Sequence, residues 1–204
     1  MTKAARIALA VLCALNAAVR PAEADGPERS AAELMDVLMW NREPVGGPFS
    51  LLGHDGRRHA PEEFRGKLML VYFGFSYCPD ICPTDLQEMS RAIELLGPAG
   101  GDIQPLFITV DPERDTAEHL KTYVSLFHPR LLGLTGSLDE IRRVARLYKA
   151  SFQKADTPDG YTVDHSAYVY LMGRDGAYLG FFPPNTPAER MLTMIRPHLG
   201  PPGR

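Results

Sequence analysis

Residues 68–75, Leu-Met-Leu-Val-Tyr-Phe-Gly-Phe, form an almost wholly apolar run with the length of a β-strand. A strand that is apolar on both faces is typical of the middle of a sheet that is covered on both sides. Cys78 and Cys82 follow within a few residues, and each is itself followed by a proline. The sequence therefore places two thiols just beyond the end of a buried central strand.

A helix is predicted directly after the second thiol. Pro83 has a fixed φ and no N–H, which suits the first turn of a helix, and its ring disfavours the α conformation at Cys82. We therefore expect Cys82 to be the N-cap residue. Apolar residues then recur at helical spacing, at Leu86, Met89, Ile93 and Leu96, and acidic residues expected in the first turn are Asp85 and Glu88.

The position of the two thiols favours reactive chemistry. A thiol at a helix N-terminus faces unpaired backbone N–H groups and the positive end of the helix dipole, and both favour the thiolate. Thiolates bind soft metals and attack disulfides. The alternative is a structural disulfide, but closing so short a loop adds only about 2 kcal/mol of stability.

The rest of the chain alternates between strands and helices. Predicted strands cover residues 103–110, 131–134, 168–171 and 178–182, and predicted helices cover 116–127, 137–148 and 186–199, the last two opening with the capping boxes Ser137 to Glu140 and Thr186 to Glu189. Residues 151–163 read as a polar loop. This alternation predicts an α/β fold whose strands are parallel, with an antiparallel hairpin near its end.

The N-terminus has the features of a secretory signal. Lys3 and Arg6 precede an apolar stretch over residues 7–19, which contains Cys13, and the small residues around Glu23 fit a cleavage site. We predict a signal peptide over residues 1–24. The alternative is an uncleaved membrane anchor, although the apolar stretch is shorter than the roughly 20 residues that a membrane span needs.

The remaining chain divides into two parts. Residues 25–48 are predicted to form a lead-in helix, at residues 31–40, and a linker rich in glycine and proline. Residues 49–200 are predicted to form the compact domain, which starts with a β-hairpin around Asp55-Gly56.

Without residues 1–24 the chain keeps 19 of its 22 basic and 24 of its 25 acidic residues. This charge, with no cluster of lysine and arginine, argues against a nucleic-acid partner.

A histidine near the end of the domain could complete a metal site. His165 lies in the phrase Asp164-His165-Ser166, where the predicted polar loop meets the strand at residues 168–171. Two thiolates and one imidazole form a soft ligand set that suits Cu(I), tolerates Cu(II) and is also chemically feasible for Zn(II). Asp164 could orient the imidazole. On spacing alone, however, a single histidine is more often structural than a ligand.

Three phrases in this order resemble the Sco/SenC family: residues 74–83, Gly-Phe-Ser-Tyr-Cys-Pro-Asp-Ile-Cys-Pro; residues 110–116, Val-Asp-Pro-Glu-Arg-Asp-Thr; and Asp164-His165-Ser166. The resemblance covers residues 49–199. It implies a thioredoxin-like central sheet flanked by helices, with an N-terminal β-hairpin extension. It also implies a copper site made by Cys78, Cys82 and His165, in which the two cysteines form a disulfide when oxidised. Tyr77 stands where histidine is frequent in the family.

Two carboxylates are candidates for contacts around these ligands. Asp164 precedes His165, and Asp111 follows the strand predicted at residues 103–110, at the edge of the sheet where sites in α/β folds gather. For residues 110–116, which contain Asp111, the favoured alternative to direct ligation is that Asp115 or Thr116 caps the next helix.

The resemblance also implies a function. Family members deliver copper to, or maintain the thiols of, the binuclear copper site in subunit II of cytochrome c oxidase. We therefore expect a periplasmic metallochaperone, not an enzyme, that holds one Cu(I) or Cu(II). Subunit II is its expected partner, and another copper chaperone or a thioredoxin-like reductant is a further one.

Two alternatives use the same cysteines. One is a thiol–disulfide reductant that keeps the cysteines of a partner reduced, and the other is a signalling protein that responds to copper or redox state. Thioredoxin-type oxidoreductases have CxxC spacing and a proline before the strand that faces the pair. Here the spacing is CxxxC, and residues 163–167 contain no proline. These differences favour metal binding.

Overall fold

The computed structural model describes residues 44–158 and 160–200. The predicted signal peptide or anchor, the lead-in helix and most of the linker lie outside these residues. The described end of the linker, residues 44–48, contains no helix or strand, but Val45 is buried and the Gly46 N–H donates to the Leu147 carbonyl at 2.8 Å. Within the described residues, no helix has the length and apolar character needed to cross a membrane.

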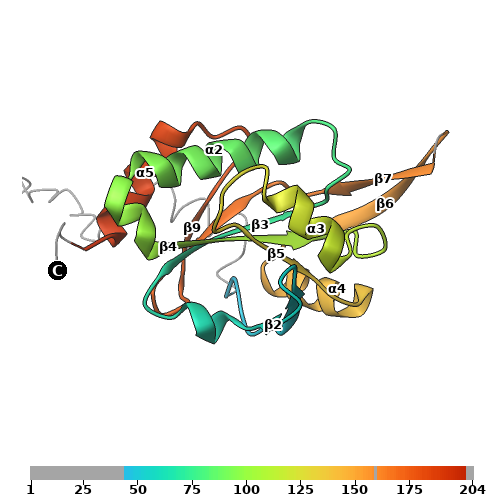
Figure 1. Ribbon diagram of the computed structural model, residues 1–204, viewed down its shortest axis with the longest axis horizontal. Coiled ribbons are helices and arrows are strands. Elements are labelled where there is room, and N and C mark those ends of the chain that lie inside the picture. The colour runs from blue at the N-terminus through green and yellow to red at the C-terminus, as the bar shows by residue number, and fades with distance from the viewer. Residues whose placement is uncertain (1–43, 159, 201–204) are drawn as a thin grey trace, which may run out of the picture. The chain divides into compact units, whose positions relative to one another are not determined.

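A seven-stranded mixed sheet forms the centre of the domain (Figure 1). Its order is β2-β1-β5-β4-β3-β8-β9. The strands are β1 (Leu51–Gly53), β2 (Arg58–His59), β3 (Leu68–Gly74), β4 (Ile103–Thr109), β5 (Leu132–Thr135), β8 (Val169–Met172) and β9 (Tyr178–Phe182). The strands β3, β4 and β5 are parallel, as predicted, and the N-terminal hairpin β1–β2 and the hairpin β8–β9 are antiparallel.

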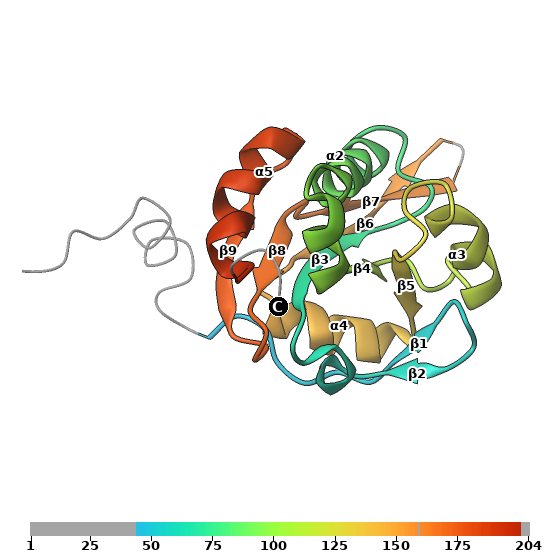
Figure 2. The ribbon, with the colours of Figure 1, turned by 60° about the vertical axis from the view of Figure 1, so that its left-hand side comes forward.

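Helices cover both faces of this sheet. They are α2 (Ile81–Leu95), α3 (Ala117–Val124), α4 (Leu138–Leu147) and α5 (Ala188–Ile195), with 3-10 helices at Pro61–Phe64, Gly97–Asp102 and Arg196–His198. Figures 1 and 2 show α2 and α5 together on one face and α4 on the other. The predicted α/β fold with flanking helices and an N-terminal hairpin is confirmed.

Every residue of the central strand β3 is buried. Its last residue, Gly74, leaves no room for a side chain, because an added Cβ would lie 2.8 Å from the Tyr72 ring and 2.9 Å from the Cys82 sulfur. Glycine thus lets the first turn of α2 approach the end of the strand. The cysteines are therefore attached to the buried centre of the sheet.

Side-chain caps fix the starts of two helices. Ser137 is the N-cap of α4 and forms the predicted capping box with Glu140. Thr116 is the N-cap of α3 and accepts a hydrogen bond from the His119 N–H. Both starts agree with the sequence prediction, although α3 ends at Val124 rather than at residue 127.

Two predicted helix starts are wrong by one or two residues. The helix α2 begins at Ile81 with Asp80 at the N-cap, so Cys82 lies inside the first turn. Pro83 is tolerated there because the first N–H groups of a helix have no partner within it. At α5, the Thr186 hydroxyl donates to the Pro183 carbonyl instead of capping the helix. The free N–H of Ala188 donates to Glu88 of α2 at 2.7 Å, so a second helix supplies the cap.

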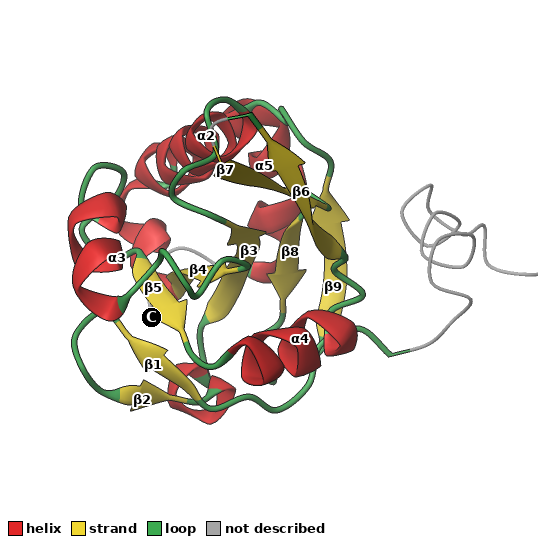
Figure 3. Cartoon of the chain, turned by 90° about the vertical axis from the view of Figure 1, so that its right-hand side faces the viewer, coloured by secondary structure: helices red, strands yellow, loops and turns green. Residues whose placement is uncertain are grey.

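The predicted polar loop at residues 151–163 is the main error. It forms two antiparallel strands, β6 (Phe152–Thr157) and β7 (Gly160–His165), which make a separate two-stranded sheet (Figure 3). Both faces of β6 carry exposed polar residues, so the apolar alternation that signals a half-buried strand is missing. As a result His165 is the last residue of a strand and not part of a loop.

Candidate metal centre

Cys78 lies in the turn that follows β3. Its N–H donates to the Phe75 carbonyl at 3.2 Å, which closes the turn and directs the thiol toward α2. The residue is partly exposed, and the neighbouring Tyr77 side chain is 54% exposed. An approaching molecule can therefore reach Cys78.

Cys82 lies in the first turn of α2 and is fully buried. Its backbone N–H, which has no partner within the helix, donates to the Cys78 sulfur at 3.5 Å. Both cysteines are free thiols in the structure. The helix start thus faces Cys78 with a hydrogen-bond donor, as expected for a stabilised thiolate.

The two thiols have opposite pKa shifts. The pKa of Cys78 is well below the ordinary value, because the Cys82 thiol donates a hydrogen bond to it, and contacts with His165 and the backbone N–H groups add to this, while burial opposes the shift. The pKa of Cys82 is raised, because it donates its proton to Cys78 and because it is buried. The two shifts favour the thiolate at Cys78 and the protonated thiol at Cys82.

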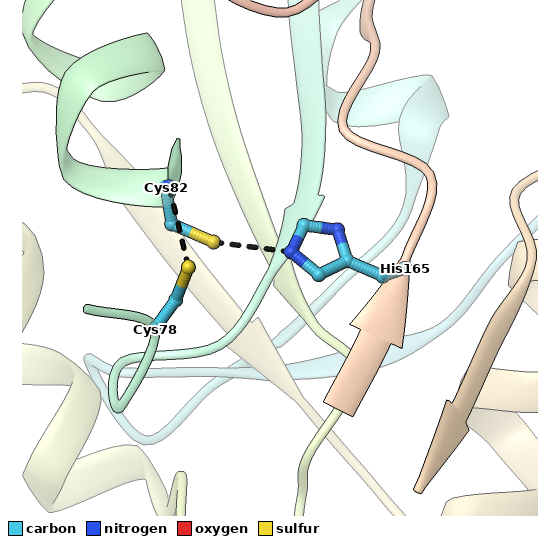
Figure 4. Close-up of side chains that lie close together, drawn as sticks. All are labelled: Cys78, Cys82 and His165. Carbon is cyan, nitrogen blue, oxygen red and sulfur yellow. Dashed lines mark hydrogen bonds between the residues drawn. The ribbon is translucent and has the colours of Figure 1, made fainter. Parts of the chain in front are cut away.

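His165 faces the cysteines from the end of β7. Its Nε2 lies 3.3 Å from the Cys82 sulfur (Figure 4). Its Nδ1 lies 3.3 Å from the Ser166 carbonyl oxygen. In the tautomer with the ring proton on Nδ1, that proton goes to the Ser166 carbonyl and the lone pair of Nε2 is available to a metal ion. The rings of Tyr72 and Phe75 meet the imidazole edge-on.

The geometry of this group fits a single soft metal ion. The two sulfur atoms and one imidazole nitrogen lie within 4.8 Å of one another. Around a three-coordinate ion with bonds of about 2.0 to 2.3 Å, ligand atoms lie roughly 3.5 to 4 Å apart. The structure thus brings together all three predicted ligand residues, Cys78, Cys82 and His165, at a spacing that needs little adjustment to hold an ion.

A buried carboxylate fixes the loop that carries Cys78. Asp115 accepts hydrogen bonds from the Ser76 N–H at 3.0 Å, from the Ser76 hydroxyl and from the Thr109 hydroxyl at 2.6 Å. Since the Ser76 proton goes to Asp115, the Ser76 oxygen accepts from Nε2–H of His119, 2.9 Å away. Sequence reasoning missed Ser76, whose only signal was its place two residues before Cys78.

A second buried carboxylate lies on the other side of Cys82. Asp85 accepts from the Tyr72 hydroxyl at 3.1 Å and from the Asn185 N–H at 2.7 Å. Burial raises the pKa of Asp85 above its ordinary value. Asp85 therefore links α2 to the central strand and to the start of α5. Because α2 begins at Ile81, neither Asp85 nor Glu88 lies in its first turn, contrary to the sequence prediction.

The two candidate carboxylates Asp111 and Asp164 are placed differently. Asp111 is fully buried and accepts from Arg114 and, at 2.9 Å, from the Tyr161 hydroxyl. Asp164 is exposed and adjoins His165 on β7, so its side chain points to the opposite face of that strand. Among the described residues, no hydrogen bond or ion pair joins either carboxylate to the three ligand candidates.

Comparison with known proteins identifies the family. The SCO1/SenC family model matches residues 39–200, which is most of the chain. The chain belongs to the SCO1/SenC family. Among relatives of this SCO1/SenC protein, the mitochondrial SCO2 homologue of Bos taurus is 44% identical over 157 residues, which cover 75% of this chain and 59% of the relative. The chain thus spans less than two thirds of the length of these curated relatives, 59% of the bovine SCO2 homologue and 54% of the human SCO1 homologue.

Solved structures of the SCO1/SenC family have the same fold. ScoI of Arabidopsis thaliana with copper bound has a TM-score of 0.71 and 42% identity, covering 75% of this chain and 99% of that one. BsSco, a member of the Sco family of cytochrome c oxidase assembly proteins in which a disulfide switch was identified, has a TM-score of 0.61 and 27% identity, covering 76% and 95%. The predicted thioredoxin-like fold and the resemblance to the family are confirmed.

Proposed function

We propose that this SCO1/SenC protein is a periplasmic copper metallochaperone. In this proposal one copper ion is held by Cys78, Cys82 and His165 and passes to the binuclear copper site of cytochrome c oxidase, with subunit II as the acceptor. The observation that carries the proposal is the convergence of two sulfur atoms and one imidazole nitrogen within 4.8 Å. This soft ligand set suits Cu(I) better than any hard cation.

The difference in exposure between the cysteines suits a carrier. Cys82 is fully buried, whereas Cys78 is partly exposed. His165 is partly exposed as well, so a ligand of the acceptor can reach the bound ion from the side of Cys78 and His165 but not through Cys82. Transfer is then a ligand exchange in which an acceptor ligand replaces Cys78 before Cys82 and His165 release the ion. The thiolate character of Cys78 lets it bind copper without first losing a proton.

Support for copper and for the oxidase comes from the relatives. A. thaliana ScoI was solved with copper bound, and BsSco is one of the cytochrome c oxidase assembly proteins. The periplasmic location rests on the signal sequence predicted at residues 1–24.

A thiol–disulfide reductant is the second candidate. The lowered pKa of Cys78 and its partial exposure are properties of an attacking thiolate, and buried Cys82 is placed to resolve a mixed disulfide. In that reaction the Cys78 thiolate attacks a partner disulfide, the partner leaves as a thiol, and a Cys78–Cys82 disulfide remains. The disulfide switch of BsSco agrees with such chemistry.

Cu(I) titration of the reduced protein against a chromophoric chelator separates the candidates. The wild type should bind one equivalent tightly. His165→Ala should bind more weakly by more than the roughly 10–100-fold typical of changes outside the ligand set. Reduction of a disulfide substrate should change little, because His165 is not the attacking or the resolving group.

The matched control is His198→Ala, which removes an exposed histidine of the C-terminal 3-10 helix. This variant should bind copper like the wild type. If His165→Ala also binds like the wild type, the ligand assignment is wrong. If the wild type itself does not bind Cu(I) tightly but reduces a disulfide substrate rapidly, the reductant replaces the chaperone as the function.

A further inference from the structure

The strand that carries His165 is not part of the central sheet. The strands β6 and β7 pair only with each other, whereas Cys78 and Cys82 are attached to β3 and α2. Hydrogen bonds between Ser151 and Ser166 close the base of the β6–β7 hairpin. They join its two ends but do not fix its angle to the cysteines. The short connection over residues 166–168 ties His165 to β8, which pairs with β3, and side-chain contacts hold the rest of the hairpin toward the thiols.

Arg114 makes those contacts with three aromatic rings. Its guanidinium carbon lies 3.9 Å from the centre of the Tyr161 ring, 4.7 Å from that of Tyr77 and 5.8 Å from that of Phe75. Tyr161 belongs to β7 and lies on the same face as His165, four residues away. Tyr77 adjoins Cys78, and Phe75 contacts the imidazole edge-on. The guanidinium thus touches both segments that supply ligand candidates.

Polar contacts fix the orientation of this guanidinium. Arg114 Nε donates to buried Asp111, and Nη1 donates to the Tyr161 carbonyl at 3.1 Å. The Tyr161 hydroxyl donates to the same Asp111 carboxylate at 2.9 Å. Asp111, Arg114 and Tyr161 therefore form a closed triangle between the loop after β4 and the hairpin. Cation–π stacking adds to the attraction between the guanidinium and the rings.

We propose that Arg114 is a positioning residue that holds the His165 hairpin against the cysteine loop at the spacing the metal needs. The inference rests on the proposed copper site, but its structural half can be tested without copper. Neither Arg114 nor its triangle touches the candidate ligand atoms, so any effect on binding must pass through Tyr161 and Phe75 to His165, or through Tyr77 to Cys78. A lysine ammonium group is not planar and cannot stack on the aromatic rings while it hydrogen-bonds to Asp111, so lysine is not an equivalent replacement.

The first test follows the hairpin in the copper-free, reduced protein. Arg114→Met keeps the length of the side chain but loses the charge and the fork. Amide hydrogen exchange should become faster across Gly160–His165 and stay unchanged in β3, because only the hairpin loses an anchor. Arg143→Met, which changes an exposed arginine of α4, should leave both regions unchanged. Unaltered exchange in the hairpin of Arg114→Met would overturn the proposal.

The second test measures coupling to His165 through Cu(I) affinity. Arg114→Met should weaken binding by roughly 10–100-fold in the wild-type background. In a His165→Ala background it should change affinity by less than about twofold, the range in which independent effects cannot be distinguished. An equal loss in both backgrounds would mean that Arg114 acts on the cysteines or on general stability, which would contradict the proposal. Arg114→Lys should recover only part of the loss.

Two further arms keep the result decisive. If Arg114→Met does not fold, Tyr161→Leu removes the opposite half of the stack and should give the same hairpin exchange and the same coupling to His165. If His165→Ala alone leaves copper affinity unchanged, the proposed copper site fails, and hydrogen exchange still decides whether Arg114 anchors the hairpin.

Discussion

Cys78 and Cys82 have opposite properties although only three residues separate them. The difference arises because Cys82 lies inside the helix and gives both its N–H and its thiol proton to Cys78. Burial on β3 and Gly74 keeps Cys82 from solvent, while the turn after β3 leaves Cys78 partly exposed. The pair therefore has one nucleophilic member and one protected member.

This difference predicts how each thiol reacts with iodoacetamide. Because the pKa of Cys78 is lowered, its thiolate should persist as the pH falls below the ordinary thiol pKa, so Cys78 should still react at mildly acidic pH. Cys82 should react much more slowly at every pH, because it is buried and its pKa is raised. Mass spectrometry of the alkylated peptides, as a function of pH, measures both rates.

The Cys82→Ala variant tests whether the Cys82 thiol is what lowers the pKa of Cys78. It removes the donor that makes the largest contribution to the low pKa of Cys78, so the pH profile of Cys78 alkylation should move to higher pH. An unchanged profile would show that His165 and the backbone N–H groups stabilise the thiolate without the Cys82 thiol. Equal alkylation rates for both cysteines in the wild type would contradict the assignment of their roles.

At the scale of elements, the sequence was informative where local signals dominate. An unbroken apolar run predicted β3, and the serine and glutamate of a capping box predicted the start of α4. The hairpin β6–β7 was missed because both of its faces carry polar residues, and its attachment depends on Arg114 and Tyr161, which are 47 residues apart. The sequence Pro158-Asp159-Gly160, a combination typical of turns, was the local signal that could have revealed it.

The candidate site shows the same limit. The spacing of Cys78 and Cys82 indicated their chemistry directly, whereas His165 became a candidate ligand through the family resemblance. Arg114 was visible in the phrase at residues 110–116, but its stacking depends on rings from two other segments. Periodicity and motifs cannot show a contact of that kind, because it forms only after the fold brings the segments together.

The contact between α2 and α5 yields a prediction about stability. Glu88 of α2 accepts from the Ala188 N–H and so replaces the side-chain cap that α5 lacks. Glu88→Ala should lower the free energy of unfolding by about 1 kcal/mol, the usual effect of losing an N-cap. Urea unfolding followed by circular dichroism measures this change.

Glu94→Ala is the matched control, since Glu94 is an exposed glutamate on the same helix. Its effect should stay within about 0.5 kcal/mol, as for other surface changes. An equal loss of stability in both variants would mean that the carboxylate of Glu88 does not cap α5 in solution.

At the scale of the domain, the parallel order of β3 and β4 explains why the site forms where it does. The carboxyl ends of parallel strands meet at one edge of a sheet, so the cysteine loop and the loop after β4 lie side by side. Asp115 of the second loop then binds Ser76 of the first. The fold thus brings the cysteines and their anchor together before His165 is added.

Metal binding to such a site should stabilise the whole domain. A ligand at 100 times its dissociation constant stabilises the folded state by about 2.7 kcal/mol, and for a chain of this size that is a rise in Tm of roughly 5 to 10 °C. Differential scanning calorimetry of the reduced protein, with and without Cu(I) under anaerobic conditions, should show this rise.

The Cys82→Ser and His165→Ala variants test whether the rise comes from the proposed ligands. Cys82→Ser should lose nearly all of it, and His165→Ala should keep only part, because two thiolates remain. The same rise in Cys82→Ser as in the wild type would indicate that copper binds elsewhere. Removing copper with a chelator should return the wild type to its metal-free Tm.

The separateness of the hairpin has an evolutionary consequence. Two candidate ligands belong to the core, where most substitutions lower stability, but the third is on a ribbon outside the main sheet. Substitutions in β6 and β7 can therefore change the position of His165 while the stability of the core stays above the threshold that folding requires. Related proteins can therefore differ in which ion the site binds, or in how fast the ion is released, while the central sheet stays the same.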